Sequence, residues 1–271
     1  MRINFSLAAA VLHTSGPVPQ VKAAATRSLE IATRLGNRTF QARALWALQQ
    51  QHYMLGEYHG ALTFSERMNK LALQGGAIEP FTDRFMSLTL HLVGRHAEAR
   101  AHGERALELS ATSKRSLHSR FFQYEVQVAA RTQLSRIMWV HGFPDRAVAL
   151  ADEGLERTLA LDYAPQVCTS IIFSTFPIAF WTGDIAAARR YANLLQDWFQ
   201  DLAAGCWQSW TRCYKMLAEL TADDGSAAFR NIVASLRTMA SVPVCGDILP
   251  ALREELVVPE AIARAENGQA G

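Results

Sequence analysis

The side chains best suited to recognising a ligand are aromatic residues and arginines that recur at fixed distances before glycine. Positions 10 and 3 before each glycine hold Trp46 and Tyr53, then Arg84 and His91, then Thr132 and Trp139. Aromatic side chains supply contact area, and arginine orients carboxylates and phosphates. These positions predict a groove for a peptide, a partner helix or a small anionic effector, formed by Trp46, Tyr53, Arg84, His91, Arg136 and Trp139. The same spacing is also typical of a helical core, and both interpretations stay open.

A second candidate site is the polar connection between Ser110 and Arg120. It carries the cations Lys114, Arg115 and Arg120. Loops presented by a rigid scaffold often carry function, so this segment could dock an anion or a partner. The alternative is a solvated linker between repeats.

Motifs for catalysis or metal binding are not found in the sequence. His91, His96 and His102 are five and six residues apart, which does not match a His-x-x-x-His pair on a helix. Neither a phosphate-binding glycine loop nor a nucleophile elbow is present. Acid pairs such as Asp152-Glu153 are adjacent on a helix and point apart. We therefore expect a protein that is not an enzyme and has no metal or cofactor, unless an acid–base constellation is assembled across repeats.

The elements that position these residues follow a recurring triplet of glycine, alanine five residues later and a small residue four further on. The triplet begins at Gly56, Gly94, Gly142 and Gly183, at intervals of 38, 48 and 41 residues. Such a period is typical of stacked helical hairpins. Glycine ends a helix at low cost, and small side chains let two helices approach closely beside the turn.

The apolar spacing between these turns predicts helices at 40–55, 57–74, 80–93, 96–109, 121–141, 145–161, 164–181 and 184–202. A fifth, more divergent hairpin is expected at 206–221 and 226–239, and an unpaired helix after Pro19. Residues 1–240 form the predicted repeat array, and 241–271 form a partly helical, acidic, frayed C-terminal tail. The prediction is an all-α, tetratricopeptide-like α-solenoid of about five helical hairpins, wound as a right-handed superhelix.

Composition limits the classes of partner and compartment. The net charge of +2 does not favour direct nucleic-acid binding. The four cysteines include no Cys-x-x-Cys pair, and a disulfide framework is not needed in a chain of 271 residues. Ile171–Trp181 is too short for a membrane span and contains Pro177. A cytoplasmic protein without membrane contact is expected.

Several segments resemble a known family. They include Arg43-Ala-Leu-Trp, Gly56-Glu-Tyr, Ala129-Ala-Arg with Trp139, Gly142-Phe-Pro-Asp and Phe180-Trp-Thr-Gly-Asp. From about Leu7 to Glu266 the chain is similar to the tetratricopeptide-like C-terminal region of bacterial ATP-binding transcriptional regulators of the signal-transducing ATPase class. Those regulators also have a winged-helix head and an ATPase, whose motifs these residues lack. The resemblance implies a truncated, split or stand-alone repeat module that contributes to transcription regulation.

Together these observations predict a protein-interaction or effector-sensing repeat module that holds its partner in a concave groove. The alternative is a structural remnant or scaffold fragment without a ligand, which self-associates through an uncapped end of the array.

Overall fold

A computed structural model describes residues 2–74, 79–112, 125–199 and 205–219. Helices account for nearly all of these residues and no strand occurs among them, so the chain is all-α over these ranges. Contacts divide the chain into two compact units, Met1–Arg157 and Thr158–Gly271. Each unit is described by itself.

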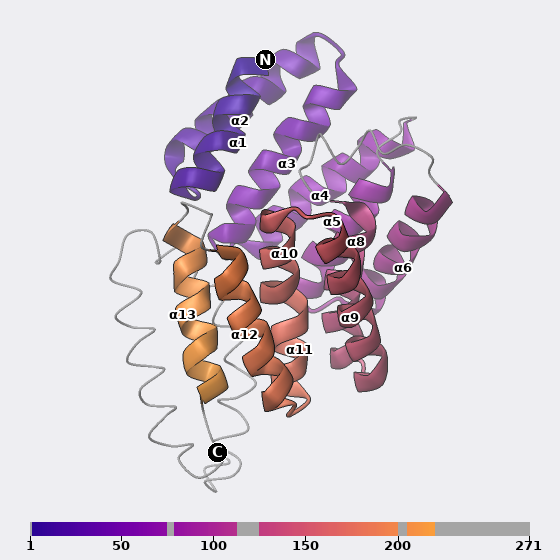
Figure 1. Cartoon of the computed structure of the whole chain (residues 1–271). Helices are drawn as coiled ribbons and strands as arrows, with labels where there is room; N and C mark the ends of the chain where they lie inside the picture. The colour runs from indigo at the N-terminus through magenta and orange to yellow at the C-terminus, as the bar shows by residue number, and fades with distance from the viewer. Residues whose placement is uncertain (1, 75–78, 113–124, 200–204, 220–271) are drawn as a thin grey trace, which may run out of the picture. The chain divides into compact units, whose positions relative to one another are not determined.

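The first unit is a succession of helices in which each of those from α1 to α8 packs against the next described helix along the chain (Figure 1). Its helices are α1 (Arg2–Ser15), α2 (Pro19–Arg34), α3 (Arg38–Met54), α4 (Tyr58–Leu73), α5 (Glu79–Leu92), α6 (His96–Thr112), α8 (Val126–Val140) and most of α9 (Pro144–Ala160). Those from α3 onward confirm the predicted helices to within a few residues. The prediction of an unpaired helix after Pro19 is wrong, because α1 packs against α2.

The turns between helices share one hydrogen-bonded geometry. Gly36, Gly56, Gly94 and Gly142 have φ between 61° and 82°. After Gly94, the amide of Arg95 donates to the carbonyl of Leu90 at 2.8 Å, and the amide of Gly94 itself donates to His91. This is the Schellman turn, which satisfies the last carbonyls of a helix and requires a left-handed residue. A Cβ at Gly94 would meet no atom within 4 Å, so backbone conformation alone selects glycine there.

The amide of the alanine in each triplet makes the first backbone hydrogen bond of the second helix of the hairpin. The amides of Ala61, Ala99 and Ala147 donate to the carbonyls of Glu57, Arg95 and Phe143, the residues that follow the glycines. All three alanine side chains are fully buried. The small residue four positions on is buried as well, at Ser65, Gly103 and Ala151. The triplet therefore places its two small residues on the buried face of the second helix.

Gly103 shows how tight this contact is. A Cβ built at Gly103 would lie 2.7 Å from Leu134 Cδ2 and 2.9 Å from Ser87 Oγ, so α6 touches α5 and α8 at one position. Contacts this short force neighbouring groups to shift.

We predict that Gly103→Val destabilises the protein by about 1–3 kcal/mol, because the added side chain overpacks this contact. The free energy of unfolding from urea titration tests it. Ala101→Val places the same side chain on an exposed position of the same helix and should cost only the lower helix propensity of valine, about 0.6 kcal/mol. Equal effects at both positions would show that the contact has room to spare.

The core of the first unit is formed mainly by alanine, leucine and large aromatic side chains. Its members include Leu12, Val21, Trp46, Met68, Phe81 and Phe85, which come from five successive helices. Every residue from Phe81 to Leu90 is buried, so α5 is the central helix of the unit. The polar side chains of α5, among them Asp83 and Arg84, are therefore buried against neighbouring helices.

The second unit repeats the hairpin pattern around Gly183, whose φ is 81°. It contains α10 (Ala164–Ser170), the π-helical turn η2 (Ile171–Thr175), α11 (Phe176–Trp181), α12 (Ile185–Phe199) and α13 (Gly205–Glu219). These confirm the predicted helix at 164–181 and, as far as Phe199, the one predicted at 184–202, whose last three residues lie outside the described ranges. The partner of α13 in the predicted fifth hairpin and the predicted tail at 241–271 lie outside the described residues.

The apolar segment in this unit is longer than the sequence suggested. The helical stretch Ala164–Trp181 has 18 residues with a mean hydropathy of 1.2, which meets the length and composition of a membrane span. The expectation that this apolar segment is too short for a membrane span is therefore wrong on length and composition. Two thirds of the stretch is buried in the structure, as in the core helix of a folded domain.

Pro177 explains the π-helical turn. The amide of Phe176 donates to the carbonyl of Ile171 rather than to that of Ile172, and Pro177 has no N–H to donate. The carbonyl of Ile172 would therefore lack a helical donor, and the π-helical turn is a single-turn bulge at this interruption. Tyr214 from α13 donates its hydroxyl to this carbonyl at 2.6 Å, while its ring stacks on Phe176 with centroids 3.7 Å apart.

We predict that Tyr214→Phe destabilises the protein by about 1–3 kcal/mol, because the buried carbonyl of Ile172 loses its donor while ring packing is kept. Thermal unfolding followed by circular dichroism measures this. Tyr163→Phe is the matched control at a tyrosine that is 40% exposed. If both variants unfold at the wild-type temperature, another donor reaches the carbonyl.

Candidate functional site

The residues predicted to form the groove separate into two groups by depth. Ten residues before the glycine, Trp46 and Arg84 are only 2% and 7% exposed. Three residues before the glycine, Tyr53, His91 and Trp139 are all partly exposed. The end of each first helix next to its turn therefore offers side chains to a ligand, whereas the middle of the helix is buried.

Trp46 packs within the core of the first unit. Its ring lies 6.1 Å from that of Phe5, which comes from α1. Trp46 is therefore a core residue, which was one of the two interpretations of the spacing. Its contact comes from α1, the helix that the sequence did not predict. Arg84 is also deep, with its guanidinium 4.5 Å from the centre of the Phe85 ring.

Three histidines gather where α5, α6 and α8 end or begin. His91 Nδ1 lies 3.0 Å from His96 Nδ1, so one ring donates a hydrogen bond to the other. The ring centroids of His96 and His141 are 6.4 Å apart. The turns at Gly94 and Gly142 bring these rings together, although their sequence spacing matches no metal motif. Within the described ranges, no group of three or more His, Cys, Asp or Glu residues is arranged to hold a metal ion.

The environment of His91 favours its neutral form. Burial lowers the pKa of His91 to about 3, and the positive charge of Arg136 and the neighbouring rings of His96 and His141 act in the same direction. Burial and His141 also lower the pKa of His96. The predicted residues His91 and Arg136 are thus brought close enough to interact. At neutral pH the positive charge at this position belongs to Arg136.

We predict that the pKa of His91 makes stability fall as pH decreases. The unfolded chain takes up a proton near pH 6.5 and the folded chain only near pH 3, so unfolding is favoured in that window. Between pH 7 and pH 5 this amounts to about 2 kcal/mol. His91→Gln should remove most of this loss in urea titrations at several pH values. The exposed His59→Gln is the control, and an unchanged pH slope in His91→Gln would contradict the assignment.

Asp83 forms a buried ionic contact that the sequence analysis did not identify. Its carboxylate lies 2.7 Å from His102 Nδ1 and 3.1 Å from Arg105 Nε, and its side chain is only 5% exposed. The pair joins α5 to α6 across their hairpin. A buried carboxylate needs such partners, because an unpaired buried charge is strongly destabilising.

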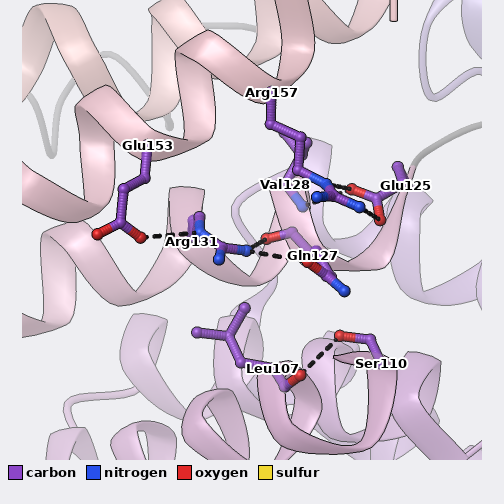
Figure 2. Close-up of polar contacts among 8 residues, drawn as sticks. All are labelled: Leu107, Ser110, Glu125, Gln127, Val128, Arg131, Glu153 and Arg157. Carbon is purple, nitrogen blue, oxygen red and sulfur yellow. Dashed lines mark hydrogen bonds and ion pairs between the residues drawn. The ribbon is translucent and has the colours of Figure 1, made fainter. Parts of the chain in front are cut away.

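The next hairpin has an ion pair in the same register. Arg131 Nε lies 3.2 Å from Glu153 Oε2, joining α8 to α9 (Figure 2). Arg131 and Glu153 are each eleven residues from Gly142, just as Asp83 and Arg105 are each eleven residues from Gly94. Counting outward from the glycines was the signal in the sequence that could have predicted both pairs.

A second contact strengthens the hairpin of α8 and α9. Glu125 accepts a hydrogen bond from the amide of Val128 and therefore caps α8. The same carboxylate receives both Nε and Nη2 of Arg157 at 3.0 and 3.2 Å (Figure 2). Bidentate arginine contacts of this kind fix geometry as well as charge. Charged residues on these helices thus serve the packing of the hairpin.

The remaining candidates contribute no site in the described residues. Lys114, Arg115 and Arg120 of the predicted anion or partner loop lie outside them. Cys168 and Cys213 are buried free thiols, and burial raises the pKa of Cys168 to about 12. A thiol with such a pKa is not a nucleophile at neutral pH.

Comparison with known proteins gives no further assignment. No family model matches the chain, and no curated protein or solved structure matches it either.

Proposed function

We propose that the chain is a non-enzymatic helical-repeat module that binds a protein partner or a small effector. The observation that carries this proposal is the recurrence of one turn at Gly56, Gly94 and Gly142, each followed by a fully buried alanine. Units of this kind bury their apolar faces by stacking, and stacked units present extended binding surfaces.

In this proposal the hairpins stack as a tetratricopeptide-like, right-handed α-solenoid. The resemblance to the C-terminal region of ATP-binding transcriptional regulators gives the module its context, which is signal-dependent control of transcription. The module would act through protein contacts in the cytoplasm, without itself binding nucleic acid or a membrane.

The binding surface that we propose is the set of partly exposed side chains three residues before the glycines. In the first unit these are Tyr53, His91 and Trp139; Arg136 interacts with His91 but is itself buried, with 8% of its surface exposed. Aromatic side chains and arginine are the residue types that contribute most to binding energy at interfaces. Trp46 and Arg84 support this surface from the core.

Site-specific photo-crosslinking in the native host tests the surface. We predict that a benzoylphenylalanine at position 139 forms a discrete adduct, because a partner covers Trp139. The same probe at Val148, which is 37% exposed on α9, should not form this adduct. Trp139→Ala, in a chain without the probe, should reduce co-purification of the partner identified by crosslinking by at least about tenfold, as expected for an interface hot spot.

Two outcomes would contradict the proposal. Identical adducts at positions 139 and 148 would show that the probe reports only random collisions. An adduct between two copies of this chain, together with concentration-dependent sedimentation, would favour the alternative of a self-associating scaffold.

A further inference from the structure

A cavity of about 190 Å³ lies between α6, α8 and α9 of the first unit. Its lining comprises Arg100, Glu104, Leu107, Leu134, Met138, Phe143, Arg146 and Leu150. On α6 the lining residues are four and three positions apart, and on α8 and α9 they are four apart, so each helix contributes one face. The turn at Gly142 contributes Phe143.

The lining is apolar apart from three charged groups. Arg100 is paired with Glu104 at 2.8 Å, and its guanidinium lies 5.6 Å from the centre of the Phe143 ring. Arg146 makes no hydrogen bond or ion pair with any residue that the structure describes. One positive charge therefore remains at the cavity, beside an aromatic ring that is 49% exposed.

The cavity is partly open to solvent and has room for one ring. An apolar cavity of about 150 Å³ is known to admit benzene, so 190 Å³ accommodates a ring with one small substituent. Phe143 offers an aromatic face, and the thioether of Met138 is a favourable neighbour for a ring. A complete peptide interface would need a much larger surface.

We propose that this cavity binds a planar aromatic monocarboxylate, with the ring over Leu134, Met138 and Phe143 and the carboxylate on Arg146. The guanidinium of Arg146 supplies a bidentate partner for the carboxylate. The single residual charge of the lining matches the single charge of the ligand.

This cavity is distinct from the surface around Trp139. Leu134 and Met138 are four residues apart and share a face of α8, whereas Trp139 is displaced from them by about 140° and 100° around the helix. The aromatic carboxylate site therefore does not include Trp139, and its test is separate.

The test is a ¹⁹F NMR titration of the full chain with 4-fluorobenzoate. Saturable binding is expected, and Arg146→Gln should weaken it about tenfold, because a hydrogen-bonded charge is removed. The neutral 4-fluorobenzamide should bind wild type about tenfold more weakly than the acid does. Leu107→Trp, which fills the cavity and keeps Arg146, should abolish binding.

Arg67→Gln is the matched control, since Arg67 is also exposed and lies 5.6 Å from the centre of the Phe64 ring. It should bind the acid as wild type does. Absence of saturable binding, equal binding of acid and amide, or equal weakening in the Arg67 and Arg146 variants would each overturn the proposal. If Leu107→Trp fails to fold, the comparison of Arg146→Gln with Arg67→Gln and of acid with amide decides the question.

Discussion

The structure of the first unit depends on a backbone constraint at its glycines. A residue with φ near 80° ends one helix, and the following residue accepts the first hydrogen bond of the next. This fixes the register between the two helices of each hairpin, so residues at equal distances from the glycine meet. The ion pairs Asp83–Arg105 and Arg131–Glu153, whose members each lie eleven residues from their glycine, follow from that one constraint.

The two registered ion pairs have opposite polarity, and this has a consequence for pairing between repeats. The first helix contributes the acid in Asp83–Arg105, but the base in Arg131–Glu153. If α5 paired with α9, Asp83 would face Glu153, and if α8 paired with α6, Arg131 would face Arg105. Like charges at these positions oppose the exchange of second helices between hairpins, an error to which repeat proteins are prone.

The sequence was sufficient to predict the hairpins because their signals are local. Glycine at the turn and alanine five residues later reflect backbone geometry and close contact, which neighbouring residues determine. The hairpin of α1 with α2 was missed because its turn at Gly16 is not followed by that triplet. The π-helical turn was missed too, since Pro177 indicates an interruption but not that Tyr214 supplies the lost hydrogen bond.

Burial was the property of the candidate site that local spacing could not predict. Positions 3 and 10 before the glycine share one face of a helix, yet Trp46 and Arg84 are buried whereas Tyr53 and Trp139 are partly exposed. For Trp46 the difference arises from α1, because Phe5 of that helix packs on its ring. The spacing of residues before Gly56 gives no indication of this long-range contact.

The electrostatics around His91 limit what the partly exposed surface can recognise. A histidine on a binding surface is often a pH-dependent charge, but burial and Arg136 keep His91 neutral throughout the physiological range. The positive charge beside Trp139 is thus carried by an arginine that does not titrate. Recognition at this surface should then combine neutral aromatic rings with the constant positive charge of Arg136, which is itself only 8% exposed. That combination favours a partner with a carboxylate beside an apolar side chain and gives binding that does not change with pH between 7 and 8.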